Sequence, residues 1–174
     1  MSRTGLCLLP FFLFAACRRA APGPAEAARP APPDQIIGQF TMDSYALGGR
    51  DWTLVSPKAY VYEPDKRVEV DQPHFRFYQN GHPGAVMEAG RGRFHTDSRD
   101  IFAWDGVVIL STDGARLESP WMRYDSAKDV VVSTAPVTVT RGSSVVRGVG
   151  WEAKPDMSHM VVHHQTVEWS GPEK

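Results

Sequence analysis

The sequence predicts an all-β domain, built as a twisted roll of two antiparallel sheets. Apolar and polar residues alternate along most of the chain after residue 34, as in HFRFYQ (74–79) and VTVTRG (137–142). A period of two with one polar face is typical of half-buried antiparallel strands. Turn segments such as EPDK, QNGHPG, STDGAR and DSAKD recur at short intervals, and no window of ten or more residues favours a helix. We therefore expect one all-β domain over residues 36–170.

The first 16 residues predict a signal peptide. One Arg precedes an apolar stretch over residues 5–16, which is followed by Cys17. This stretch is shorter than the roughly 20 residues that a bilayer-spanning helix needs. The ending LFAAC resembles a bacterial lipobox, which implies cleavage before Cys17 and acylation of this residue as a lipid anchor. An ordinary signal peptide, or a short uncleaved anchor with an incidental Cys17, are the alternatives.

Residues 17–35 are predicted to be a tether. Residues 18–33 read RRAAPGPAEAARPAPP, and proline-rich segments of this kind act as extended spacers with a reach here of about 50 Å. Because Cys7 lies in the segment predicted to be removed, the mature chain keeps only Cys17 and forms no internal disulfide.

The domain contains a repeat. The segment LESPWMRYDSAKDVVVSTAPV from Leu117 parallels LVSPKAYVYEPDKRVEVDQP from Leu54. Aligning Leu54, Met87, Leu117 and Val146 gives four units at offsets of 33, 30 and 29 residues, each a strand, a turn, a strand and a loop. Such a unit cannot bury its apolar face alone, so stacked units share a core. A propeller is less suitable, because its blades have four strands each.

The chain carries no pattern of catalytic or metal-binding residues. A net charge of −1 gives no basic surface for nucleic acid. The adjacent His163 and His164 would point to opposite faces of a strand, so they cannot ligate one ion together. There is no G-x-S-x-G segment, and no Cys follows Cys17. We expect no enzyme activity, no cofactor and no metal.

Strand alternation predicts an apolar interior, which either lines a groove for acyl chains or is simply the core of a β-sandwich. Pro120 is expected to mark a bulge, so that Trp121 points outward while Met122 and Tyr124 return to the interior. The inward-facing set comprises Leu54, Phe75, Phe77, Met87, Phe94, Ile101, Val107, Ile109, Leu117, Met122, Tyr124, Val130, Val132, Val137 and Val139.

The two ends of the roll are predicted to have strand edges that can pair with a neighbouring protein. The leading stretch QFTMDSYAL (39–47) and the expected final strand MVVHHQTVEW (160–169) contain no Pro and little charge. Such edges can accept another strand unless a loop or the tether covers them. The candidate partner-edge residues are Phe40, Met42, Val161, His163 and Val167.

These segments resemble a known family. Residues 116–162 resemble the C-terminal half of the LptC family of lipopolysaccharide-export proteins, in the Leu-to-Tyr-Asp strand (117–125), Pro136-Val137 and the Gly-x-Gly-x-x-Ala segment (148–153). Residues 48–63 resemble the family's earlier Trp-x-Leu segment. The resemblance extends over about residues 36–169 and implies a β-jellyroll that is open along one side, as in the related LptA bridge proteins.

The resemblance also implies a function without bond chemistry. Acyl chains of lipopolysaccharide would lie between the sheets and pass from the inner membrane toward the outer membrane. The implied partners are lipopolysaccharide, an inner-membrane ABC transporter of the LptB/F/G type, an LptA-like periplasmic bridge protein and, through the N-terminus, the membrane itself.

One departure affects the location. Family members usually have an N-terminal membrane-spanning helix, where this chain has a short apolar segment and Cys17. We expect a periplasmic domain anchored to the inner membrane, and the outer membrane stays open because Arg18 rather than Asp follows Cys17.

Two alternatives to the transport function stay open. They are a scaffold β-sandwich lipoprotein without a lipid groove, and a sugar-cleaving jellyroll enzyme, which would need a carboxylate pair.

Overall fold

The computed structural model describes residues 31–46, 49–79 and 81–169. The predicted signal peptide, Cys17 and most of the tether lie outside these residues. Within them all regular structure is β-strand, and every strand pairing is antiparallel. The twelve strands are β1 (Gln35–Ala46), β2 (Gly49–Tyr62), β3 (Arg67–Asp71), β4 (His74–Gln79), β5 (His82–Glu88), β6 (Arg91–His95), β7 (Ile101–Ser111), β8 (Arg116–Asp125), β9 (Val130–Arg141), β10 (Ser144–Ala153), β11 (Met160–Val162) and β12 (Thr166–Trp169).

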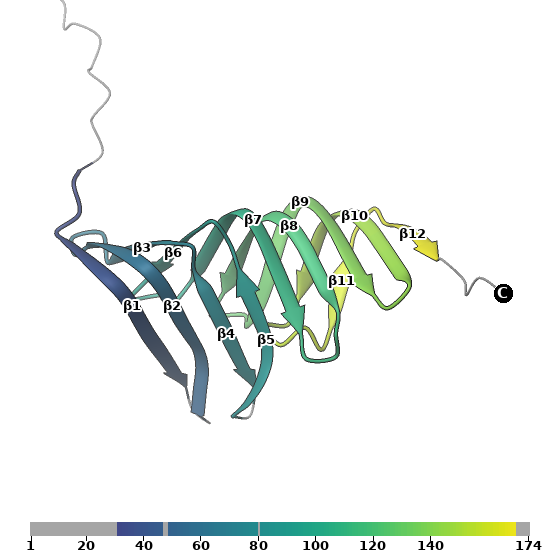
Figure 1. The fold of residues 1–174 in the computed structure, drawn as a ribbon, viewed down its shortest axis with the longest axis horizontal. Helices are drawn as coiled ribbons and strands as arrows, with labels where there is room; N and C mark the ends of the chain where they lie inside the picture. Colours follow the sequence, from purple (N-terminus) through teal and green to yellow (C-terminus); the bar gives the residue numbers. More distant parts are fainter. Residues whose placement is uncertain (1–30, 47–48, 80, 170–174) are drawn as a thin grey trace, which may run out of the picture. The chain divides into compact units, whose positions relative to one another are not determined.

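In Figure 1 the strands lie between β1 at one end of the domain and β12 at the other, with β4 and β5 in front and β3 and β6 behind. They form one continuous sheet in the order β11-β10-β9-β8-β7-β5-β4-β2-β3-β6, to which β1 adds beside β2 and β12 beside β10. A further pairing of β6 with β7 closes β2 to β7 into a ring. The predicted all-β fold is confirmed, and the arrangement is consistent with a β-jellyroll.

The long strands bend and contribute to two layers. Residues 52–55 of β2 pair with β4, whereas residues 58–62 pair with β3. In the same way, residues 108–111 of β7 pair with β5 and residues 101–104 pair with β6. We call the layer of β4 and β5, with the parts of the other strands that continue it as far as β12, the first half-sheet. The layer of β3 and β6, continued in the same way as far as β11, is the second half-sheet. The line along which the long strands bend is the crease.

The repeated Leu-x-Ser-Pro segments lie at this crease. The buried Ser56 Oγ lies 2.8 Å from the carbonyl oxygen of Lys58 and 2.6 Å from that of Asp71. Ser119 Oγ lies 3.2 Å from the carbonyl oxygen of Trp121 and 3.0 Å from that of Pro136. Each serine hydroxyl has a single hydrogen, which it donates to one of these two carbonyl oxygens at a time where the strand bends. The repeat in the sequence is thus a repeated corner in the fold.

The side-chain alternation shifts by one residue after each Ser-Pro corner. In β2 the buried positions are 54, 56 and 59, and in β8 they are 117, 119 and 122. In both strands, two outward residues instead of one follow the serine. The pairing of β8 with β9 loses register between Glu118 and Arg123. The predicted bulge at Pro120 is confirmed, with Trp121 half-buried on the outer side.

The final strand differs from the prediction of one strand over residues 160–169. Two short strands, β11 and β12, pair with β10 and are separated by residues 163–165. At the break, Val149 N donates to His163 O (3.1 Å) and His163 N donates to Gly150 O (2.8 Å). Gly150 has a φ of +83°, and a Cβ on Gly148 would lie 2.4 Å from Val162 Cγ1. The crease continues through this point, so the strand bends there instead of running straight.

Candidate functional site

The interior of the first half-sheet presents one apolar row from end to end. Strand register places one inward residue of each strand opposite the next, without interruption. Three of the four residues aligned in the sequence repeat, Leu54, Met87 and Leu117, are fully buried members of this row, and Val146 is the fourth. We call it the first interior row; it comprises Met42, Leu54, Phe75, Met87, Ile109, Leu117, Val139, Val146 and Val167.

The second half-sheet carries a matching row on its inner face. Its members are again paired strand by strand, from β2 to β11. Tyr124 is the only member with a polar atom, and its hydroxyl donates to Asp129 Oδ1 at 3.3 Å. This second interior row comprises Val61, Val68, Phe94, Ile101, Tyr124, Val131, Ala153 and Met160.

Thirteen of the fifteen residues predicted to face inward are buried and belong to one hydrophobic cluster. These thirteen are Leu54, Phe75, Phe77, Met87, Phe94, Ile101, Val107, Ile109, Leu117, Met122, Tyr124, Val137 and Val139.

The expected inward direction of Val130 and Val132 is wrong. Both are half-buried, while Val131 between them is 1% exposed. The alternation of buried positions in β9 is unbroken from Val131 to Val139, and it places the small polar Ser133 on the inner face. A continuous count back from Val139 therefore selects Val131, which pairs opposite Tyr124 and Ala153.

Side chains from the two half-sheets touch across the interior. The rings of Trp52 and Phe94 have centroids 5.8 Å apart, and those of Phe77 and Tyr124 are 6.1 Å apart, both edge to face. Trp52 also contacts Phe75 at 5.6 Å. In this state the half-sheets are in contact, so an acyl chain would need them to separate.

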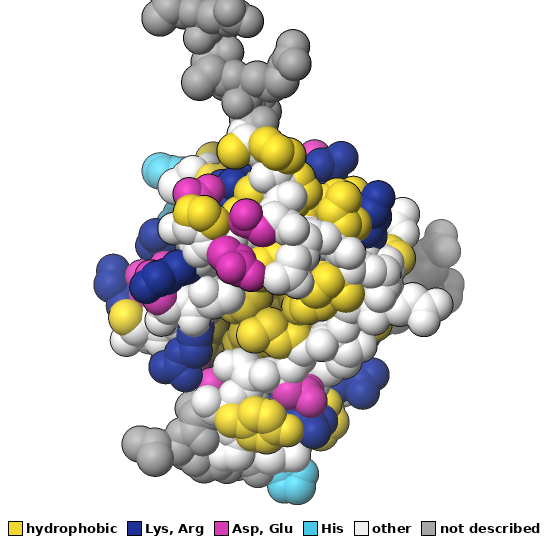
Figure 2. All heavy atoms as spheres, turned by 90° about the vertical axis from the view of Figure 1, so that its left-hand side faces the viewer, with side chains coloured by type: hydrophobic (Ala, Val, Ile, Leu, Met, Phe, Trp, Pro, Cys, Tyr) yellow, Lys and Arg dark blue, Asp and Glu magenta, His cyan; other side chains and the backbone are white. Residues whose placement is uncertain are grey.

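The apolar interior reaches the surface at both ends of the domain. At the β1 end, Ile37, Phe40 and Met42 are only partly buried against the core. At the other end, Val146 and Met160 are partly buried in the same way. Figure 2 views the β1 side, where hydrophobic side chains gather across the middle of the face with charged side chains around them. Both rows thus end in apolar surface that a neighbouring domain could extend.

The partner-edge residues lie at these ends. Phe40 and Met42 belong to β1, which among the described residues pairs only with β2, but their side chains turn toward the core. Val161 and Val167 are 38% and 59% exposed on β11 and β12. His163 is exposed in the break between these strands, and both its backbone N–H and its carbonyl are already bonded to β10.

Charged side chains surround Tyr124 at the margin of the interior. Lys154 Nζ lies 3.5 Å from Asp129 Oδ2, the carboxylate that accepts from Tyr124. Burial raises the pKa of the Tyr124 phenol above its usual value, and the charge of Asp129 raises it further. Burial also raises the pKa of Asp51, an effect that Arg99 opposes and Asp129 reinforces. These residues give the margin a mixed charge.

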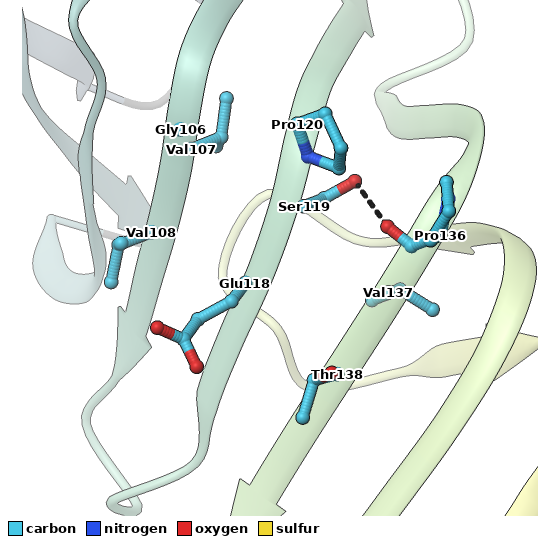
Figure 3. Close-up of a pocket in the computed structure, with 9 residues that line it drawn as sticks. All are labelled: Gly106, Val107, Val108, Glu118, Ser119, Pro120, Pro136, Val137 and Thr138. Carbon is cyan, nitrogen blue, oxygen red and sulfur yellow. Dashed lines mark hydrogen bonds between the residues drawn. The ribbon is translucent and has the colours of Figure 1, made fainter.

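The outer side of the crease is hollowed where β8 and β9 separate. This hollow has a volume of ≈ 380 Å³. Figure 3 shows the residues that line it, with Pro120 and Pro136 on adjacent strands and the bond from Ser119 to the carbonyl of Pro136. Glu118 is the only charged side chain among its lining residues. A lone carboxylate among prolines and valines offers no acid–base pair.

Two further properties concern the described residues as a whole. They contain no group of three or more His, Cys, Asp and Glu side chains that could hold a metal ion. None of them forms a helix with the length and hydropathy of a membrane span.

Several interior residues were missed from the sequence. Trp52 and Trp151 are 2% and 1% exposed, and Met157 is 5% exposed within the same cluster. Trp52 could have been found, because it lies two residues before Leu54 on the same face. Val61 could be placed only by knowing that the alternation of inward residues shifts after Pro57. Met157 lies in a turn, where no periodic pattern points to burial.

Comparison with known proteins gives one match and one negative result. The sequence model of the family described as "Lipopolysaccharide-assembly, LptC-related" matches residues 6–167, which is nearly the whole chain. No curated protein matches the chain.

Proposed function

The chain belongs to the LptC family, and from this premise we propose that its interior holds the acyl chains of lipopolysaccharide and passes them to a neighbouring jellyroll without bond chemistry. Family membership itself gives a role in lipopolysaccharide transport, as a periplasmic component associated with the inner membrane. The observation that carries the finer proposal is the pair of interior rows, which run uninterrupted from β1 and β2 to β11 and β12.

The chemistry of the rows suits an acyl chain. No member is charged, and each buried CH₂ group of a lipid would contribute about 0.8 kcal/mol in such surroundings. Because apolar side chains follow one another on nearly every strand, a chain could shift along the rows without meeting a charged side chain. A passive surface of this kind holds lipid in either direction, so the direction of transport has to come from the energy-driven partner.

The ends of the rows support transfer between domains. Met42 and Val167 terminate the first interior row on the two outermost elements, β1 and β12. A neighbouring strand added at either edge would extend both the sheet and the apolar row. We propose that an LptA-like bridge protein pairs at the β11–β12 end, and that a transporter of the LptB/F/G type adjoins the β1 end.

Anchoring completes the proposal. Cys17 as an acylated residue, and residues 17–35 as a tether, would hold the domain near the inner membrane. The lipobox-like sequence before Cys17 supports the lipid anchor, family membership supports the inner membrane, and an outer-membrane anchor is the alternative.

A scaffold β-sandwich without a lipid site is the second candidate. The ring contacts between Trp52 and Phe94, and between Phe77 and Tyr124, favour it, because they fill the interior in the present state. The two candidates differ in whether the half-sheets separate to admit lipid.

Mass spectrometry of the protein purified from its membrane in mild detergent tests the proposal. We expect lipopolysaccharide to copurify with the wild type. Val146→Asp, which charges the first interior row, should reduce the bound lipid. Val145→Asp is the matched control, because Val145 is the outward neighbour with similar partial exposure. A folded wild-type protein without bound lipid would contradict the lipid-holding proposal and favour the scaffold.

A further inference from the structure

The turn after β10 differs from the three earlier turns on the same side of the domain. Each of the four turns contains one residue with positive φ, namely Lys66 (48°), Arg99 (63°), Asp129 (52°) and Met157 (63°). The first three are charged and exposed. The fourth turn, residues 154–159, is longer and has an apolar residue at this position. A left-handed conformation is unfavourable for most side chains, so it needs support from its surroundings.

Met157 obtains that support from the interior. Its side chain is 5% exposed and belongs to the same hydrophobic cluster as the interior rows. Methionine is flexible and fills irregular apolar gaps. The 154–159 turn therefore inserts one unbranched apolar chain into the space between the half-sheets.

The turn also reaches across to the first half-sheet. A hollow of ≈ 330 Å³ is lined by Asp156, Met157 and Ser158 from the turn and by residues of β4, β5 and the start of the β7–β8 turn. A Cβ built on Gly84 of β5 would lie 2.7 Å from Asp156 Cβ and 3.1 Å from Asp156 Cα. Only glycine at position 84 lets the turn sit this close.

The hydrogen bonds of the turn are internal or run to its own half-sheet. Met157 N donates to Lys154 O (2.9 Å), Lys154 N donates to His159 O (2.9 Å), and Ser158 Oγ donates to Asp156 Oδ1 (2.7 Å). Lys154 Nζ donates to the backbone oxygen of Asp129 (3.3 Å). Among the described residues, no hydrogen bond joins the turn to β4 or β5. The contact with the first half-sheet is made by packing, so the turn can lift without breaking its own bonds.

We propose that the 154–159 turn is a lid that closes the interior on the side away from the crease, and that the Met157 side chain occupies the interior until an acyl chain displaces it. Lipid would then be admitted from the side, beneath the lid, as well as from the ends. This inference rests on the proposed lipid-holding function, since the lid has no role if the interior never accepts a chain.

Oxidation of methionine by dilute hydrogen peroxide, followed by mass spectrometry, tests the lid in the full-length protein. Dodecanoate serves as the acyl probe, and its binding is measured first by calorimetry. We expect saturating dodecanoate to raise the oxidation rate of Met157 roughly five-fold, because exposure controls the reaction. Met87 and Met122, both 0% exposed, are internal controls that should stay protected.

Two substitutions test the same point without relying on one variant's stability. Gly84→Ala should push the turn outward and raise the rate of dodecanoate uptake on the order of ten-fold, through a larger population of the open lid. Gly38→Ala is its control, because a Cβ there meets nothing within 4 Å. Met157→Ala should accelerate uptake in the same way, whereas the volume-conserving Met157→Leu should not.

The outcomes separate the two levels of the proposal. If no variant, nor the wild type, binds dodecanoate, the lipid-holding function and the lid both fail. If dodecanoate binds while Met157 stays protected and Gly84→Ala leaves uptake unchanged, the lid is wrong and the lipid-holding function stands. Equal oxidation of Met87, Met122 and Met157 would show a general opening, which also contradicts a lid.

Discussion

The Leu-x-Ser-Pro corner occurs twice, in β2 beside the β1 end and in β8 in the middle of the strand order, and the two ends of the domain are finished differently. At the β1 end, Ser56 bonds the carbonyl groups of its corner, and a continuous strand of 12 residues covers β2. In β8, Ser119 performs the same role and also accepts a bond from Trp151 Nε1 of β10 at 3.2 Å. At the far end, the strand that covers β10 is divided into β11 and β12.

The difference shows how one repeat serves two kinds of edge. A long edge strand leaves one side for pairing, and β1 stays one strand despite a φ of +51° at Gln39 and a register shift between Ser44 and Tyr45. The divided edge follows the crease closely, because Gly148 lets it approach β10, and it exposes Val167 at the end of the first interior row. We infer that the β11–β12 end is more sensitive to substitutions at the crease than the β1 end. The following experiments test that asymmetry.

Gly148→Ala should have the largest effect. Its Cβ would meet Val162 Cγ1 at 2.4 Å and the carbonyl oxygen of His163 at 2.5 Å, so the last strand must move. Overpacking of this kind costs about 3 kcal/mol. Gly38→Ala on β1, where nothing lies within 4 Å, should change the free energy of unfolding by less than about 0.5 kcal/mol. Denaturant unfolding measures the free energy of unfolding of both variants. Equal values would contradict the expected difference between the two ends.

Ser119→Ala should cost about 2 kcal/mol, more than Ser56→Ala at about 1 kcal/mol. The reason is that Ser119→Ala leaves the indole N–H of Trp151, a residue that is 1% exposed, without its partner. In Ser119→Ala combined with Trp151→Phe, part of the loss should be non-additive, as a double-mutant cycle would show. Additive losses would mean that the indole bond contributes nothing to the difference between the corners.

Val167→Asp should weaken docking of an LptA-like bridge protein by about ten-fold, equivalent to about 1.4 kcal/mol. Val167 is 59% exposed, so the domain should stay folded. Ile36→Asp on β1 is the matched control with the same 59% exposure, and it should leave this docking unchanged. Titration of the bridge protein by calorimetry gives the affinities. An unaffected affinity in Val167→Asp would argue against docking at this end.

The smallest expected effect concerns Tyr124. Its pKa is raised in the folded protein above the usual value of about 10, so the unfolded chain loses the phenolic proton first as the pH rises. The free energy of unfolding should therefore decrease above about pH 10, by about 1 kcal/mol up to pH 11. Tyr124→Phe should lack this component of the decrease. Identical pH profiles for the two proteins would show that Tyr124 is not held in its neutral form.

The sequence predicted features that depend on local periodicity. The all-β fold, the repeat aligned on Leu54 and Leu117, and the bulge at Pro120 all follow from alternation and from proline's missing N–H. The inward-facing residues at the start of β9 were predicted wrongly. Val130 and Val132 are apolar, whereas the true alternation places the polar Ser133 on the inner face.

Features set by distant contacts could not be read in this way. The division of the last strand depends on the close approach of Gly148 to Val162, and the burial of Met157 depends on the position of Gly84. Neither leaves a periodic trace, because in both cases the partner residues are far apart in the sequence. The lipid site itself has no local signature, since a groove and a core use the same residues.

Photo-crosslinking in living cells tests the central claim most directly. A benzophenone side chain would replace Phe77, Ile109 or Val139 on the inner face, and Arg76 or Thr138 on the outer face of the same strands or their neighbours. We expect lipopolysaccharide adducts at the three inner positions and few at the two outer positions. Adducts confined to Arg76 and Thr138 would contradict an interior that carries lipid.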